Sequence, residues 1–356
     1  MSRFVQLHLL TAYPPSNLNR DDSGRPKTAI MGGAQRLRIS SQSLKRAWRT
    51  SDVFADVLGA RVGKRTQRIG EVVEAHLLAK GVDAEKARAA ARQVAAVFGK
   101  AKPEDDDNPT FTEQLVFIAP DEQASALSLA ERLATGDLAE IKASDALVKA
   151  DTAADIAMFG RMLADNPSFN REAAVQVAHA ITTHKAMVED DYYVAVDDLK
   201  DSASREDAGT SFIGVSEYGA GVFYVYLCID TALLKANLAG DAALAQDAVE
   251  ALVRAATTVA PRGKQASFAS RARASFLLAE AGDTQPRSLA AAFLVPVPER
   301  SNDPLRASVE RLLKLKADFA AGYGEAGLSS ATMDLTGDTP AGTLDAVVSF
   351  VRAAVA

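Results

Sequence analysis

A cluster of basic side chains occupies the segment "RISSQSLKRAWRTS", residues 38–51, in a chain whose net charge is −6. Lys45, Arg46 and Arg49 lie close together there, and no acidic residue follows until Asp52. Grouped Lys and Arg side chains are typical of a surface that binds phosphate groups. The alternative is a solvated helix face, which normally mixes charges of both signs.

A helix is predicted to position these side chains. Ser40 or Ser41 is a good N-cap, so the helix should run from Gln42 onward. At 100° per residue it has two faces. The basic face holds Gln42, Lys45, Arg46 and Arg49, and the packing face holds Leu44, Ala47, Trp48 and Ser51. One side should therefore be buried while the other presents a cationic stripe.

The charge of the chain is unevenly distributed. Residues 20–68 carry twelve Lys/Arg against four Asp/Glu, a charge of +8, so the remainder carries −14. A strongly basic segment in an acidic protein indicates a local site for a polyanion, because Lys and Arg release counterions from phosphates. The acidic remainder argues against general adhesion to nucleic acid.

The overall composition predicts a globular protein without a membrane segment. A length of 356 residues allows about two domains, or one large domain with insertions, and 48% hydrophobic residues support a sizeable core. The single cysteine, Cys228, excludes an internal disulfide framework and a multi-cysteine zinc site. The N-terminus turns polar too early for a signal peptide, and no run of about 18 apolar residues occurs. We expect a cytoplasmic protein that contacts no membrane.

Strands and helices are both expected over the whole length, which indicates an α+β fold. A helical region extends over about residues 70–150, interrupted by the loop "KPEDDDNP" and the short strand 114–119, and a further helix covers 241–259. The segment 174–184 is either a strand or a short helix. Other strands are predicted at 3–13, ended by Pro14 and Pro15, and at 36–40, 155–162, 222–229, 274–280 and 291–297.

A long polar segment covers residues 185–221 and is too rich in glycine and acidic residues for a core element. Its apolar residues nevertheless recur at hairpin-like intervals: Tyr192, Tyr193, Val194, Val196, Phe212 and Ile213. A protrusion of this length within a compact domain is usually functional or disordered.

Few residues suggest catalysis. No glycine-rich phosphate loop is present, and His179 and His184 are five positions apart, which suits polar contacts better than a metal site. The pair Asp21/Asp22 lies beside the basic residues of the loop 16–35, which we call the basic loop. It is the candidate for the metal-binding carboxylates of a metal-dependent nuclease. The alternatives for this pair are a charge partner for Arg20 and a turn former.

Six segments carry a family resemblance. They are "NLNRDDSGRPKTAIMGGAQRLRISSQSLKRAWR", "DIAMFGRM", "VAHAITTH", "YYVAVDDL", "AGVFYVY" and "GKQASFA". In order and rough spacing, the sequence is similar to the CasC-type backbone subunit of the type I-E CRISPR Cascade complex (Cas seven family, RAMP superfamily). The resemblance extends from residue 1 to about 280, and is dense at the N-terminus and thin in the helical region.

The resemblance implies an RRM-like (ferredoxin-like) palm with an inserted helical fingers subdomain and a β-hairpin thumb. The implied boundaries are residues 1–65 and 155–300 for the palm, 66–154 for the fingers, 186–221 for the thumb within the palm, and 301–356 for C-terminal helices. The thumb should be mobile in the free monomer, because a hairpin with no core of its own orders poorly.

The function that follows from the resemblance is a non-enzymatic scaffold without a cofactor. Several copies would bind along a CRISPR guide RNA and present it to target DNA, together with the large, small, five-prime-end and RNA-processing subunits of Cascade. Two alternatives remain: a metal-dependent ribonuclease that uses Asp21/Asp22, and an independent RRM-type RNA regulator. The first strand lacks the stacking aromatic pair of such a regulator.

The site residues are transferred position by position. The RNA-binding set is Arg20, Lys27, Ser40, Gln42, Lys45, Arg46, Arg49, Arg161, Met162, Lys264 and Gln265. Met162 would wedge against bases, with a core methionine as the alternative. Lys264 and Gln265 would contact the guide or a neighbouring copy. The sequence departs from its relatives at Ala34 and Gln35, where basic residues are expected, and at Arg49, which is often lysine.

Overall fold

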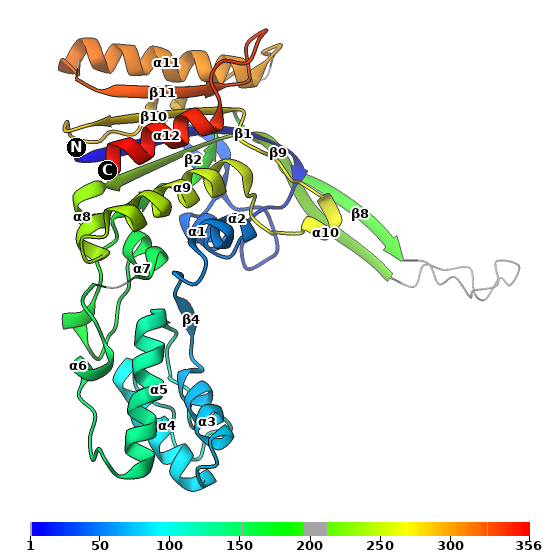
Figure 1. Ribbon diagram of the computed structural model, residues 1–356. Coiled ribbons are helices and arrows are strands. Elements are labelled where there is room, and N and C mark those ends of the chain that lie inside the picture. Colours follow the sequence, from blue (N-terminus) through cyan, green and yellow to red (C-terminus); the bar gives the residue numbers. More distant parts are fainter. Residues whose placement is uncertain (1, 151, 196–211, 299, 326) are drawn as a thin grey trace, which may run out of the picture.

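A large antiparallel sheet is the centre of the computed structural model, which describes residues 2–150, 152–195, 212–298, 300–325 and 327–356 (Figure 1). The strands follow the order β11-β10-β1-β9-β7-β3-β2, with β6 and β8 also paired to β9. Their bounds are β1 Phe4–Ser16, β2 Thr28–Met31, β3 Ala34–Ile39, β6 Val175–Val177, β7 Ala180–Thr182, β8 Glu189–Ala195, β9 Phe212–Asp230, β10 Phe276–Gly282 and β11 Ser329–Asp334.

The two faces of the sheet form two apolar cores. Alternation along β1 sends Leu7 and Leu9 to one face and Leu10 to the other, where Leu10 joins Tyr224 of β9. The first face is covered by α1 Ser41–Arg49, α2 Asp52–Leu58, α7 Ala154–Phe159, α8 Thr231–Asn237, α9 Ala242–Thr258 and α12 Leu344–Val355. The second face is covered by α11 Pro304–Tyr323 and the short 3₁₀ helix η2 Ala290–Phe293. Both faces of the central strands are thus buried, which explains their apolar composition.

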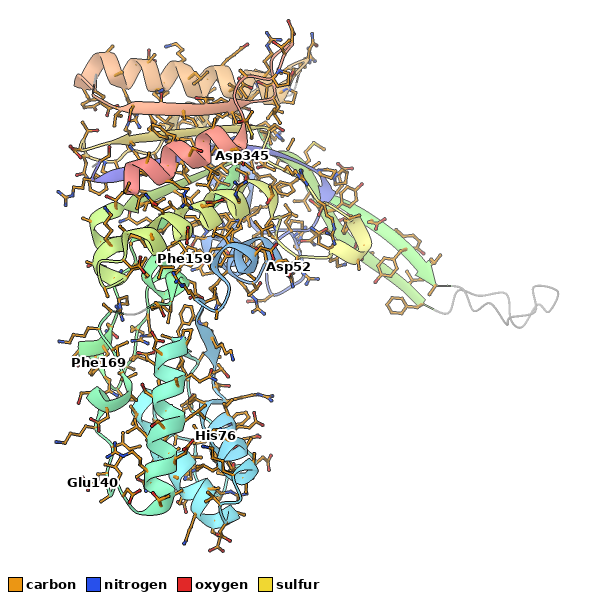
Figure 2. The ribbon with its side chains drawn as sticks, in the orientation of Figure 1. Asp52, His76, Glu140, Phe159, Phe169 and Asp345 are labelled. Carbon is orange, nitrogen blue, oxygen red and sulfur yellow. The ribbon has the colours of Figure 1, made fainter. Side chains whose placement is uncertain are left out.

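A separate helical lobe lies below the sheet layer in Figure 1. It contains β4 Lys64–Thr66, α3 Ile69–Ala79, α4 Ala84–Phe98, β5 Val116–Ile118, α5 Pro120–Thr135, α6 Ala143–Ala146 and η1 Pro167–Phe169. Its apolar cluster also includes Leu163 and Phe169, so it draws on residues beyond 154, and Phe169 is labelled in the lobe in Figure 2. Gly70 allows α3 to approach the loop that contains Thr110, since a Cβ on Gly70 would lie 2.0 Å from the Thr110 carbonyl oxygen.

A two-stranded ribbon extends from the sheet (Figure 1). β8 pairs with the first part of β9 from Glu189↔Tyr218 to Ala195↔Phe212, which confirms the predicted hairpin for its described residues. Every residue of β8 is exposed. Residues 196–211, and with them Val196, lie outside the described part of the chain, and the mobility of the thumb in the free monomer stays a prediction.

The α+β class is confirmed, but several element predictions were wrong. Residues 155–162 are not a strand: α7 covers Ala154–Phe159 and ends at Gly160, whose φ is 79°. Residues 291–297 contain η2 and not a strand, and the C-terminal region contains β11 as well as helices. β1 does not stop before Pro14 but continues to Ser16 through a register shift. The ambiguous segment 174–184 contains the strands β6 and β7.

In the described residues, no helix is both long enough and apolar enough to cross a membrane.

Candidate nucleic-acid interface

Helix α1 carries the basic face at the centre of the candidate site. The Ser40 hydroxyl caps it by accepting a hydrogen bond from the Ser43 amide at 3.3 Å, and Leu44 and Trp48 are buried beneath it. Gln42 and Arg46 are exposed, while Lys45 is half-buried. Burial, and then repulsion from Arg65, lowers the pKa of Lys45. The predicted helix and its buried face are confirmed, and RNA binding by the outer face stays a prediction.

Arg49, at the end of the same face, has partners within the protein. Its guanidinium lies 3.3 Å from Oδ2 of the buried Asp155 and over the Phe117 ring at 4.8 Å. Asp155 Oδ1 accepts hydrogen bonds from the amides of Gly63, at 2.7 Å, and Ile156, at 3.0 Å. Burial raises the pKa of Asp155 to about 6, against the lowering effect of these partners. Arg49 therefore links α1 to the helical lobe and is less available to a ligand than Lys45 or Arg46.

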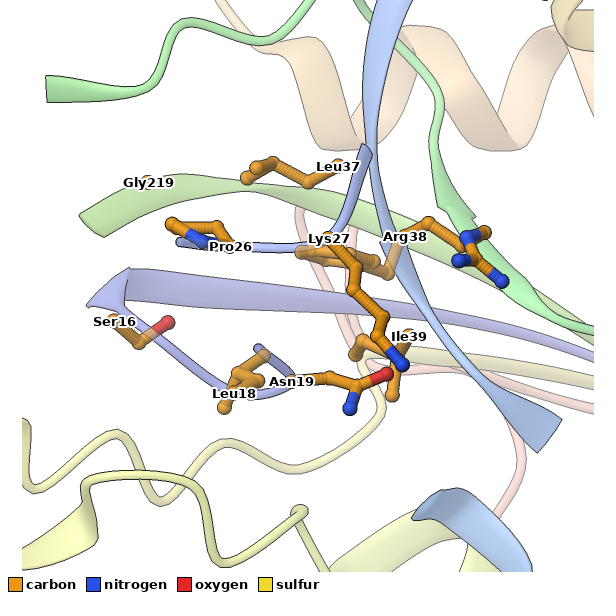
Figure 3. Close-up of a pocket in the computed structure, with 10 residues that line it drawn as sticks. Ser16, Leu18, Asn19, Pro26, Lys27, Leu37, Arg38, Ile39 and Gly219 are labelled. Atoms are coloured by element: carbon orange, nitrogen blue, oxygen red, sulfur yellow. The ribbon is translucent and has the colours of Figure 1, made fainter. Parts of the chain in front are cut away.

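The loop before β2 is attached to the start of α1. Asn19 Oδ1 accepts a hydrogen bond from the Ser40 amide at 2.8 Å, and the Asn19 carbonyl accepts one from the Lys27 amide at 2.8 Å. Figure 3 shows the Lys27 side chain extending toward Asn19, while Arg38 points away from it. The exposed Arg20 and Arg46 line one open cleft of about 600 Å³. The loop and α1 thus form one basic surface.

His179 lies among the cations of this surface, although its spacing from His184 predicted only polar contacts. Its Nδ1 is 3.3 Å from both the Ser41 amide nitrogen and the Arg38 guanidinium, so it acts as an acceptor. The pKa of His179 is lowered by burial and then by Arg38, Lys27 and Lys45. The structure therefore brings these three cations together around a neutral imidazole, a convergence that sequence spacing does not reveal.

Asp21 forms a turn. Its Oδ1 accepts hydrogen bonds from the amide and hydroxyl of Ser23, at 2.9 and 2.7 Å, and from the Arg25 amide at 3.0 Å. The Ser23 hydroxyl is the main reason that the pKa of Asp21 lies below its usual value. Within the described ranges, no group of three His, Cys, Asp or Glu side chains could hold a metal ion. The turn-former alternative fits this geometry.

Arg161 requires a correction, because its side chain is buried. Its Nη1 lies 2.5 Å from Glu122 Oε2 of α5, and it also donates to the carbonyls of Phe117, Val148 and Phe169 at 3.2 to 3.4 Å. A guanidinium occupied in this way cannot contact RNA in this conformation. Its neighbour Met162 is 77% exposed, so the core-methionine alternative is wrong and the side chain is free to meet a ligand.

The turn of Lys264 and Gln265 lies against the basic loop. A Cβ on Gly263 would lie 2.3 Å from the Leu18 carbonyl oxygen, so glycine permits this close approach. Gln265 Nε2 donates to the carbonyl of Pro261 at 3.0 Å and to the Ser270 hydroxyl at 3.2 Å, which holds the turn together. Gln265 is therefore mainly structural, whereas the half-buried Lys264 precedes it beside the surface.

The hairpin of β8 and β9 is attached at the edge of the same surface. Arg25 Nε lies 2.6 Å from Glu217 Oε2, and Asn17 Nδ2 donates to the Glu217 carbonyl at 2.9 Å. The Tyr218 ring packs near Phe268 of α10 Gln265–Phe268, with the centroids 5.9 Å apart. The protruding ribbon thus begins where the basic loop and the 262–268 turn meet.

Comparisons with known proteins agree with this architecture. The model of the CT1975-like protein family matches residues 5–349. One solved chain, from a "CRISPR RNA-guided surveillance complex, pre-nicking", is 29% identical with a TM-score of 0.87, covering 99% of this chain and 100% of that one. Another, from a "CRISPR RNA-guided surveillance complex", is 26% identical with a TM-score of 0.73, covering 99% of each. No curated protein sequence matches significantly. Because the family match spans nearly the whole chain, the protein belongs to the CT1975-like family.

Proposed function

We propose that this protein is a guide-RNA-binding backbone subunit of a Cascade-type CRISPR surveillance complex, of type I-E. The observation that carries the proposal is the basic surface formed by α1 and the loop before β2, with a protruding hairpin attached at its edge. Contacts from Lys and Arg to phosphates do not depend on the base sequence of the RNA. A protein that holds guides of any sequence needs contacts of this kind. The solved chains of similar fold come from RNA-guided complexes, which supports this reading.

In this proposal the central sheet is an RRM-like palm, the helical lobe is the fingers, and the ribbon of β8 and β9 is the thumb. Copies stack along the guide, and each thumb reaches the next copy. The guide then pairs with target DNA, and other Cascade subunits complete the cytoplasmic complex. Lys27, Lys45 and Arg46 bind guide phosphates, and the exposed Met162 meets the bases.

The test is co-purification from cells that also express the partner subunits and a CRISPR array. We expect RNA of uniform length in the purified complex, together with several copies of this chain. A preparation that assembles with the partners yet contains RNA of random lengths, or none, would contradict the proposal.

We also propose that the subunit has no catalytic activity of its own. The Asp21 carboxylate is held by Ser23 and Arg25 in its own turn, which leaves it poorly placed to bind a divalent cation. The purified complex should leave RNA paired to the guide intact in Mg²⁺. Cleavage that disappears in Asp21→Ala or Asp22→Ala would instead establish the ribonuclease alternative.

A further inference from the structure

Three exposed arginines outside the assigned site, Arg262, Arg271 and Arg273, line an open cleft of about 680 Å³. The cleft lies between the start of α2 and the chain that follows α9, and it is also lined by Ser51, Gln265 and Thr258. Asp52, labelled in Figure 2, marks the start of α2 and is the acidic residue among those that line the cleft. Positive charge therefore dominates this opening.

This second cleft adjoins the basic surface of the candidate site through Arg262. The same side chain lines the cleft that contains Arg20 and Arg46. Its Nη2 donates to the Thr50 carbonyl, the C-cap of α1, at 3.1 Å, which fixes the guanidinium at the boundary between the two openings. A continuous line of cations thus leads from the outer face of α1 to Arg273.

The charge of this line is not neutralised within the described part of the chain, where no ion pair involves Arg262, Arg271 or Arg273. The acidic residues that line the two clefts are Asp21 and Asp52, and Asp21 is occupied by the amides of its own turn. Exposed arginines with few acidic neighbours suit a polyanion, because each one can neutralise a phosphate and release its counterion.

We propose that Arg262, Arg271 and Arg273 form a second binding segment for a nucleic-acid phosphate backbone, continuous with the surface of α1. This inference rests on the proposed function. The same phosphodiester chemistry has two possible sources: the guide itself, continuing past α1, or a complementary strand paired to the guide.

The experiment measures the salt dependence of binding for the full-length chain and for Arg271→Gln with Arg273→Gln. One probe is a single-stranded RNA, and the other is the same RNA annealed to complementary DNA. The slope measured is that of the logarithm of the binding constant against the logarithm of the salt concentration. If the guide is the source, the magnitude of this slope for the single strand should fall by about 1.4, since each lost phosphate contact removes about 0.7. If the paired strand is the source, that slope should stay unchanged and the slope for the hybrid should fall.

Two controls keep the interpretation specific. Arg3→Gln with Arg306→Gln removes the same charge at the N-terminal end of β1 and on α11, and should leave both slopes unchanged. Arg271→Lys with Arg273→Lys keeps the charge and should keep most of the wild-type slope. Slopes for the Gln pair that equal those of the Arg3/Arg306 control would overturn the inference. A wild-type chain that binds neither probe would instead overturn the proposed function.

Discussion

Lys45 and Arg46 are the residues best placed to test the basic face of α1. Both lie on its outer side, and neither forms an ion pair in the described part of the chain. Lys45→Gln with Arg46→Gln should therefore weaken RNA binding equally for all sequences and lower the log–log salt slope by about 1.4. Thermal unfolding should be unchanged, since Leu44 and Trp48 remain buried. A wild-type slope in this variant would remove α1 from the site, and the Arg3/Arg306 pair controls for net charge.

Asp155 predicts a pH dependence of stability. Its pKa is about 6 in the folded protein against an ordinary 3.8, so between these values the folded state binds the proton more tightly than the unfolded state. The contribution of Asp155 to the free energy of unfolding therefore falls as pH rises through this window, by about 3 kcal/mol in total. Asp155→Asn cannot titrate, so the wild type should lose about that much stability relative to the variant between pH 4 and pH 7. Urea unfolding of both proteins measures this, and parallel pH profiles would contradict it.

The sequence predicts side chains well where a short segment determines their environment. The packing face of α1 follows from helical spacing, and its residues Leu44, Ala47 and Trp48 are buried as predicted. Arg36 shows the limit of this approach: alternation along β3 puts its side chain on the face opposite Leu37, and that face is buried as well. Its guanidinium donates to the carbonyls of Thr182 at 2.9 Å and Phe293 at 2.7 Å, partners that only the tertiary fold supplies.

At the scale of elements, the ion pair of Arg161 and Glu122 joins α5 to the chain that returns to the sheet. Both side chains are fully buried, and Glu122 Oε2 also accepts the Ala119 amide at 3.0 Å. Arg161→Met should destabilise the protein by about 3–5 kcal/mol, because it leaves a carboxylate buried without its partner. The double variant Arg161→Met with Glu122→Gln should recover much of that loss. A stable Arg161→Met chain with weakened RNA binding would restore the original assignment of Arg161 to the guide.

The element errors have physical causes. "DIAMFG" contains β-strand formers, yet Ala154, Ala157 and Met158 lie on a short helix that is buried in the core on the first face of the sheet, and Gly160 ends it. β11 was missed because its sequence "SSATMD" is small and polar, as suits an outer strand of the sheet, where only Met333 is buried. The hairpin and α9 were predicted because alternation and helical periodicity are strong there. Pairing partners, by contrast, are determined by contacts distant in sequence.

At the scale of the whole molecule, the uneven charge predicts two separate roles for two parts of the chain. The basic segment 20–68 contributes α1 and its loop, whereas the hairpin carries the acidic run Glu189–Asp191 on an exposed strand. Tyr192 and Val215 are cross-strand partners on this ribbon and are each 63% exposed. An acidic ribbon with exposed apolar side chains is a poor binder of phosphate and a suitable binder of protein. RNA binding and assembly should therefore be separable.

Replacing residues 190–216 with a short Gly/Ser linker tests that separation. The variant retains Glu217 and Tyr218, which attach the hairpin to Arg25 and Phe268, so the monomer should fold and bind short RNA with the wild-type salt slope. On longer RNA the wild type should form complexes that grow with RNA length, and the variant should bind without cooperativity. Sedimentation on RNAs of increasing length measures this.

A milder change, Tyr192→Ser with Val215→Ser, keeps the backbone of the hairpin and its acidic run while removing one apolar cross-strand pair. If apolar contact with the next copy drives stacking, this pair should reduce cooperativity in the same direction as the deletion. Because the acidic residues are all retained, a change in charge could not cause the loss of cooperativity. Ordered multi-subunit complexes formed by the deletion variant would show that the ribbon does not join the copies, and would leave the palm surfaces as the place where they meet.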